Sequence, residues 1–268
     1  DTNGDNVAVG YQALKTLNAG ADAYNTAVGY LSGTAVTTGV RNTLVGGFSG
    51  DALTDADFNT AMGYASLGAD TLGSKSTAIG WATLATQNFT SATDSFNTAV
   101  GYGAGAAVTT GIQNTLIGAL AGDSLTDADK NVAVGYNALS TDTLGSRSTA
   151  VGVSALATQN FTSATSAYNV AVGHNAGASI TTGVQNTLIG GTTGDALTTG
   201  SSNTAIGISA LTRDTAGSKS VAIGTTALAY QNFTSATDSY NTAVGHAAGL
   251  SVTTGVQNTL IGGLAGDA

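Results

Sequence analysis

Two loops of the chain carry three carboxylates each within a short stretch of sequence. These residues are Asp51, Asp55 and Asp57 and, at the same spacing further on, Asp123, Asp127 and Asp129. Ca²⁺ takes six to eight oxygen ligands, so clustered carboxylates are its candidate ligands. The third copy keeps only Asp195 of the three, and no EF-hand glycine and glutamate complete either loop. We therefore predict no metal site, interpret these residues as turn formers on solvated loops, and keep the six aspartates as the calcium candidates.

Residues suited to catalysis are few. The chain has two histidines, His174 and His246, and no cysteine. Both histidines occupy a position of the sequence repeat that Tyr30 and Tyr102 fill elsewhere, which is typical of a packing or surface site. No Ser-His-Asp arrangement is apparent. We predict that the chain is not an enzyme, with no catalytic residue and no cofactor.

A third set of candidate residues lies in the tripeptide Asn-Phe-Thr, which occurs three times. Its phenylalanines are Phe89, Phe161 and Phe233. A spaced aromatic row can contact sugars or a cell surface, so these three are our surface and receptor candidates. The alternative is that each Phe folds back over the chain and covers apolar surface, and we favour it because an exposed Phe row promotes aggregation. The tripeptide is also an N-glycosylation sequon, relevant only if a glycosylating host makes the chain.

The elements that position these residues follow from a repeat. A five-residue unit, Asn-Thr-Ala-Val-Gly or a close variant, begins fifteen times, and from Asn25 onward the spacings run 17, 17, 17 and 21 residues. Four units form a 72-residue super-repeat, with Asn25, Asn97, Asn169 and Asn241 as equivalent positions. Self-similarity at a short fixed period predicts a solenoid. We expect an all-β fold, a parallel β-roll or β-solenoid of about 15 rungs, each rung being one coil of 17–21 residues.

Within each unit, side chains alternate between two faces of a strand. In the unit Asn97–Gly101, Thr98 and Val100 share one face, and Asn97 and Ala99 share the other. Both faces are restricted to small or apolar residues throughout, which favours a strand buried on both sides. One face would line the coil and the other would pack against a neighbouring chain. The sequence leaves the inward face undecided, and we take Val100 and its equivalents as inward.

The individual positions of the unit carry further predictions. Position two is Thr in eleven units and Val in four, which we interpret as a buried β-branched column and not as an ice-binding Thr ladder. Asn at position one is expected to form an amide ladder along the stack. The invariant Gly at position five predicts a corner at positive φ or a close approach of two backbones. A second short strand is expected after each unit, for example at residues 102–105.

Composition excludes other classes of protein. The net charge is −9, and the seven Lys and Arg residues are spread singly along the sequence, which argues against nucleic acid. No run of about 18 apolar residues is present, so we predict no membrane insertion in this segment. With neither a starting Met nor a signal peptide, and with an end partway through a unit, the sequence indicates a segment of a longer chain.

The units Asn6–Leu14 and Asn131–Leu139 both follow the pattern Asn-x-Ala-Val-Gly-Tyr-x-Ala-Leu. This pattern resembles the head repeats of trimeric autotransporter adhesins of the YadA type. It is still more similar to repeats of phage and bacterial tail-fibre-like proteins. The resemblance covers essentially the whole chain and implies a left-handed parallel β-roll in a homotrimer, extracellular or on a virion, that serves adhesion. The coils here are longer than those of the adhesins, so we expect extra loops to bulge outward.

We therefore expect residues 1–268 to form a single repetitive β-solenoid shaft within a longer fibre protein. The expected function is that of a non-enzymatic shaft of an extracellular or virion attachment fibre that mediates adhesion to a cell surface. The expected partners are two further copies of the chain and a glycan or protein receptor on a cell surface. The alternatives are a structural filament without a receptor, or a solenoid module that binds glycan, calcium or ice.

Overall fold

The computed structural model describes residues 4–267, which fall into two compact units, 4–130 and 131–267, each described by itself below. Every regular element of the described residues is a β-strand. The first unit contains β1 (Val7–Val9), β2 (Thr26–Val28), β3 (Thr43–Val45), β4 (Thr60–Met62), β5 (Gly73–Ser74), β6 (Thr77–Ile79), β7 (Thr93–Asp94), β8 (Thr98–Val100) and β9 (Thr115–Ile117). The second contains β10 (Val132–Val134), β11 (Gly145–Ser146), β12 (Thr149–Val151), β13 (Thr165–Ser166), β14 (Val170–Val172), β15 (Thr187–Ile189), β16 (Thr204–Ile206), β17 (Gly217–Ser218), β18 (Val221–Ile223), β19 (Thr237–Asp238), β20 (Thr242–Val244) and β21 (Thr259–Ile261).

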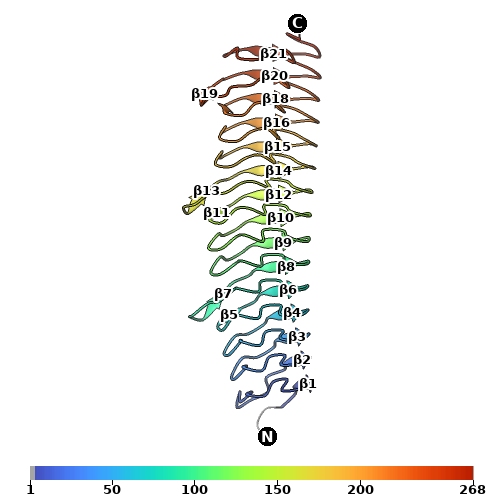
Figure 1. Ribbon diagram of the computed structural model, residues 1–268, viewed down its shortest axis with the longest axis vertical. Coiled ribbons are helices and arrows are strands. Elements are labelled where there is room, and N and C mark those ends of the chain that lie inside the picture. The colour runs from blue at the N-terminus through green and yellow to red at the C-terminus, as the bar shows by residue number, and fades with distance from the viewer. Residues whose placement is uncertain (1–3, 268) are drawn as a thin grey trace. The chain divides into compact units, whose positions relative to one another are not determined.

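In each unit the three-residue strands pair in parallel with the strands of the preceding and following coils. Pairing joins equivalent positions of the repeat, so that Thr26 pairs with Thr43, and Thr43 with Thr60. Figure 1 shows these strands stacked one above another within each unit, joined by the loops of the coils. The predicted all-β parallel solenoid of about 15 rungs is confirmed.

The inward face of the strand is the opposite of the one that we expected. Position three is the interior column, since Ala27, Leu44, Ala99 and their equivalents within residues 25–248 are fully buried. Positions two and four point outward, and Thr98 and Val100 are only half-buried. The inward assignment of Val100 and the buried β-branched column at position two are therefore wrong for the single chain. The physical reason is the coil interior beside the strand, which is narrow enough for Ala and Asn to fill.

The Asn ladder forms, but through the backbone as much as through the amides. The Asn25 Oδ1 accepts the backbone N–H of Asn42 at 2.8 Å, and the Asn42 Oδ1 accepts that of Asn59 at 2.9 Å. From Asn25 to Asn241, the Nδ2 of each position-one Asn donates across its coil to a carbonyl 14 residues later, such as Asn42 to Ala56 O at 2.7 Å. A buried amide with these bonds leaves no polar atom unpaired, which explains why Asn is so frequent here.

The invariant Gly confirms both of the predicted roles. Gly29 has φ 144°, and a Cβ there would lie 2.3 Å from the carbonyl oxygen of Gly46 in the next coil. Any side chain at this corner would separate the rungs.

A second glycine explains why every fourth rung has Leu in place of Ala at position three. Gly33 and Gly50 lie in successive coils at positive φ, and a Cβ on either would lie 2.7 Å from a methyl group of Leu44. In the coils that have Ala at position three and no such Leu beside them, a turn residue such as Leu67 or Leu84 fills the interior instead. One strand Leu therefore occupies the space beside two glycines.

The 21-residue coils replace the Asn of position one by Ser, and a Gln restores the lost amide. Gln87 Nε2 donates to Ser76 Oγ at 2.8 Å and to the buried carboxylate of Asp70 at 2.6 Å, while its Oε1 accepts from Asn97 at 2.9 Å. The Asp70 carboxylate also accepts the backbone N–H groups of Gly73 and Phe89. The extra residues extend as an arm that pairs β5 with β7 in the first unit, as Figure 1 shows. In the second unit the arms pair β11 with β13 and β17 with β19.

The second strand that we expected after each unit is not a strand. Residues 102–105 form successive turns, with Gly103 and Gly105 at φ 61° and 59°. Left-handed residues make the chain turn tightly here, so no extended segment can pair. Among the described residues, no helix is long and apolar enough to cross a membrane.

Candidate functional site

Four of the six calcium candidates form hydrogen bonds between coils, and the six do not gather around a common point. Asp55 accepts from Thr38 Oγ1 at 2.6 Å, and Asp57 accepts the backbone N–H of Val40 at 2.7 Å. In the second loop Asp127 accepts from Thr110, and Asp129 from the N–H of Ile112. Within residues 4–267, no three His or Asp side chains gather as a metal ion would require.

The first residue of each calcium loop is partly withdrawn from water. Burial raises the pKa of Asp51 and of Asp123 above the usual value of 3.8. The Oδ1 atom of Asp123 is buried without a hydrogen-bond partner among the described residues. Such a group destabilises the fold when it is ionised.

The three phenylalanines of the Asn-Phe-Thr tripeptides are buried, each with 6% of its surface exposed. Their assignment as surface and receptor candidates is therefore wrong, and the alternative, that Phe89, Phe161 and Phe233 fold back over the coil, describes their position. The Asp70 carboxylate, bonded to the Phe89 N–H, anchors the start of the arm. His174 and His246 are exposed at equivalent positions of their coils.

The surface that remains uncovered is the outward face of the strands. In the first unit, position two contributes Thr from β2 to β9, and position four contributes Val, Met or Ile. These side chains are half-buried or exposed, and none of them is charged. The outward face of the strands is therefore free of charge in the first unit, and no other segment among the described residues covers it.

Two columns of larger side chains flank this face. The column before the repeat unit, which we call the cation–aromatic column, contains Asp5, Tyr24, Arg41, Phe58, Lys75, Phe96, Gln113 and Lys130 in the first unit and Arg147, Tyr168, Gln185, Ser202, Lys219, Tyr240 and Gln257 in the second. The column after the repeat's glycine, which we call the aromatic column, contains Tyr11, Tyr30, Gly47, Tyr64, Trp81, Tyr102 and Ala119 in the first unit and Tyr136, Val153, His174, Gly191, Ile208, Thr225, His246 and Gly263 in the second.

Contacts within each column run along the stack. In the aromatic column, the rings of Trp81 and Tyr102 stack with centroids 4.8 Å apart. In the cation–aromatic column, the Arg41 guanidinium lies 5.3 Å from the centroid of Phe58, and the Lys75 ammonium 5.2 Å from that of Phe96. The aromatic members remain about half exposed.

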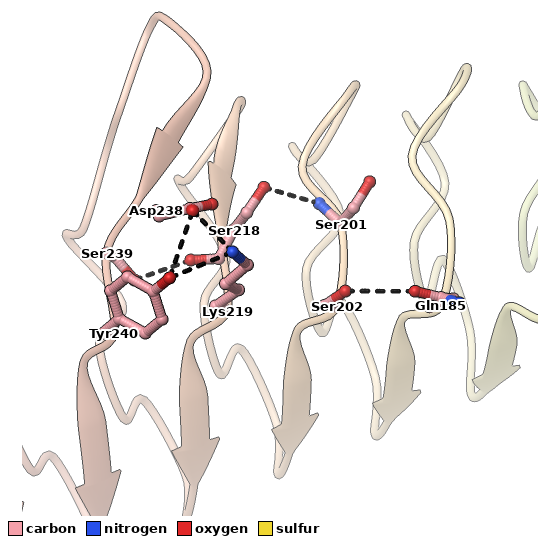
Figure 2. Close-up of polar contacts among 8 residues, drawn as sticks. All are labelled: Gln185, Ser201, Ser202, Ser218, Lys219, Asp238, Ser239 and Tyr240. Carbon is pink, nitrogen blue, oxygen red and sulfur yellow. Dashed lines mark hydrogen bonds and ion pairs between the residues drawn. The ribbon is translucent and has the colours of Figure 1, made fainter.

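Acidic residues of the arms neutralise some of these cations. Lys219 Nζ lies 2.6 Å from Asp238 Oδ2 and 3.1 Å from Tyr240 Oη, as Figure 2 shows. The hydrogen bond to Asp238 and then the one to Tyr240 raise the pKa of Lys219, and the bond from Lys219 lowers the pKa of Asp238. Figure 2 also shows successive coils joined by Ser201 N–H donating to Ser218 Oγ, and Ser202 Oγ to Gln185. Lys75 and Asp94 repeat the ion pair in the first unit.

Sequence reasoning missed this arrangement. It described the seven cations as scattered, yet Arg41, Lys75, Lys130, Arg147 and Lys219 all directly precede a repeat unit. Numbering every residue relative to the Asn of its unit would have revealed the column.

Comparisons of the chain with protein-family models, with curated proteins and with solved structures find no match.

Proposed function

We propose that residues 1–268 are the non-enzymatic shaft of an attachment fibre, extracellular or on a virion, in which three copies of the chain associate and mediate adhesion to a cell surface. The observation that carries the proposal is the uncovered outward face of the strands. Within each unit it is a stripe of Thr, Val, Ile and, in β4, Met with no charged member, flanked by exposed aromatic residues. Large apolar patches on soluble proteins mark interaction sites.

A second copy of the chain is the occupant that this face fits best. A second copy has coils of the same period, so its outward stripe can match this one rung by rung along each unit. The sequence resemblance to trimeric adhesin and tail-fibre repeats points to three chains. In this arrangement the main-chain ladders provide stiffness, and the arms face outward toward a receptor. The exposed arm tips, Thr90–Ala92 in the first unit, recur with the same sequence in the second.

The test is the mass of the protein in solution by light scattering, with one variant that places charge on the stripe. Val28→Asp, Val100→Asp and Val172→Asp combined add three carboxylates at equivalent positions of the super-repeat. We expect the parent to have the mass of three chains. We expect the variant to have the mass of one while keeping its β circular dichroism, because position four points outward.

The matched control is Ala92→Asp, Ala164→Asp and Ala236→Asp combined, which adds the same charge at the exposed arm tips. It should remain trimeric. A parent with the mass of one chain, or a stripe variant that stays trimeric, would contradict the proposal. Ala99→Asp, by contrast, places an unpaired charge in the coil interior and should abolish the β signal.

One observation favours a second candidate function. The Thr column of position two, expected to be buried, points outward in the first unit, where it is in register from β2 to β9. A regular, outward row of hydroxyl and methyl groups suits the binding of ordered water, as in ice binding. This function needs the stripe to be free, whereas the proposed trimer covers it.

A further inference from the structure

The two flanking columns lie at opposite ends of the same strand. Tyr24 and Tyr30, for example, are six residues apart, which corresponds to about 20 Å along an extended chain. Two side chains of one rung therefore do not reach each other within a single chain. Within the described residues, no ring or cation contact joins one column to the other. The contacts join members of one column a coil apart, and Tyr30 and Tyr64 also contact Phe48, which belongs to neither column.

The sizes of the two side chains on a rung are nevertheless matched. Where the cation–aromatic column has an aromatic residue, the aromatic column has Tyr or His, as in Tyr24/Tyr30, Phe58/Tyr64 and Phe96/Tyr102 of the first unit and Tyr168/His174 and Tyr240/His246 of the second. Four other rungs combine Arg or Gln in the cation–aromatic column with Gly or Ala in the aromatic column. They are Arg41/Gly47 and Gln113/Ala119 in the first unit and Gln185/Gly191 and Gln257/Gly263 in the second.

Descent of the repeats from one ancestral super-repeat does not explain every matched pair. Phe58/Tyr64 lies in a different quarter of the super-repeat from the other four aromatic pairs, yet it shows the same match. Six rungs follow neither rule, namely Lys75/Trp81, Lys130/Tyr136, Arg147/Val153, Ser202/Ile208, Lys219/Thr225 and Asp5/Tyr11. The first of these joins a cation with an indole, a favourable pair if the two side chains meet.

We propose that the cation–aromatic column of one chain packs against the aromatic column of the next chain at the same rung. The inference rests on the homotrimer of the proposed function. Three sheet faces around one axis meet edge to edge, with one edge of each chain on the opposite edge of its neighbour, which is a heterologous contact that closes after three chains. Level rungs then bring Tyr24 of one chain to Tyr30 of the next, and Arg41 into the space above Gly47.

This contact sets the axial register of the three chains. The stripe of Thr and Val is nearly the same on every rung, so by itself it permits a slip by one rung. The flanking columns disfavour the slip, because it would replace the ring pair Phe58/Tyr64 by Phe58 beside Gly47, where no ring meets it. Side chains that differ from rung to rung thus specify the axial register, which the uniform stripe does not, as in other repetitive interfaces.

The test uses the fact that the chain has no cysteine. The double variant Tyr24→Cys/Tyr30→Cys places two thiols on one rung, and a short bis-maleimide should join them between chains into a covalent trimer on a denaturing gel. The off-register control, Tyr24→Cys/Tyr64→Cys, separates the thiols by two rungs, or about 10 Å along the axis, and should give at least tenfold less. Either single variant alone should give no trimer.

Light scattering on each unreacted variant separates this inference from the proposed function. A parent with the mass of one chain ends both. A trimeric protein whose same-rung pair does not cross-link, or cross-links no better than the off-register pair, overturns the pairing and leaves the trimer standing. A covalent dimer without trimer also overturns it. If the first double variant does not assemble, Phe96→Cys/Tyr102→Cys, at the equivalent rung, replaces it.

Discussion

At the scale of the residue, Asn at position one combines two functions that no apolar residue can supply. Its Oδ1 accepts a backbone N–H from the next coil, and its Nδ2 closes the coil onto a carbonyl of the same rung. In the 21-residue coils position one is Ser, which has no amide. Gln87, hydrogen-bonded to Ser76, supplies the amide instead. The Asn ladder could be predicted from the repeat, whereas Gln87 could not, because it lies 11 residues away in sequence.

The carboxylate of Asp51 gives a prediction at this scale. Burial raises its pKa, so the stability that it contributes is complete below its unfolded pKa and is lost as the pH rises through the folded pKa. Asp51→Asn should therefore raise the melting temperature at pH 7 and have little effect at pH 3. Thermal unfolding followed by circular dichroism at both pH values measures this.

Asp55→Asn is the control for this prediction, since the Asp55 carboxylate is exposed and accepts a hydrogen bond from Thr38. It should not stabilise the protein. An Asp51→Asn variant with an unchanged or lower melting temperature at pH 7 would show that the ionised carboxylate does not destabilise the fold.

At the scale of the element, a coil is filled by complementary volumes. Leu116 lies between Gly122 of its own coil and Gly105 of the preceding coil. A Cβ on either glycine would lie 2.7 Å from a Leu116 methyl group. The sequence displays Leu at position three in every fourth rung, but the meaning of that period becomes clear only when the glycines are seen beside it. Glycines several residues away on a turn carry no signal of which strand they face.

Leu116→Ala should destabilise the protein by about 2–5 kcal/mol, because the cavity beside two glycines cannot collapse. Chemical denaturation of the purified protein measures the loss. Leu120→Ala in the same coil is the matched control, since Leu120 is half-buried and its loss should cost less than half as much. Equal effects of the two substitutions would contradict the packing described here.

At the scale of the whole molecule, the outward stripe supports one of two functions, according to whether a partner covers it. If three chains associate, the Thr column is buried and the solution should show no thermal hysteresis when it is cooled below its melting point. Nanolitre osmometry measures this directly. Hysteresis in the parent that Thr43→Leu, Thr60→Leu and Thr77→Leu combined abolish would instead establish ice binding and overturn the covered stripe.

The sequence by itself determined the period of the coils, the position of the three-residue strand in each unit and the need for Gly at the corner. These features depend on local chemistry, namely the left-handed corner, the alternation of a strand, and an amide at a fixed step. Because the unit recurs fifteen times, each of these features can be recognised in the sequence.

Only the tertiary structure decided which face of the strand is the interior. Ala at position three and Val at position four are both small and apolar, so alternation gives two equivalent answers. The choice is made where the coil closes on itself, since the space beside the strand takes the Asn amide and Ala, or Leu where two glycines leave room for it. The same closure takes Phe89 inside and aligns five of the seven cations on one edge, because distance in space and not in sequence sets which side chains meet.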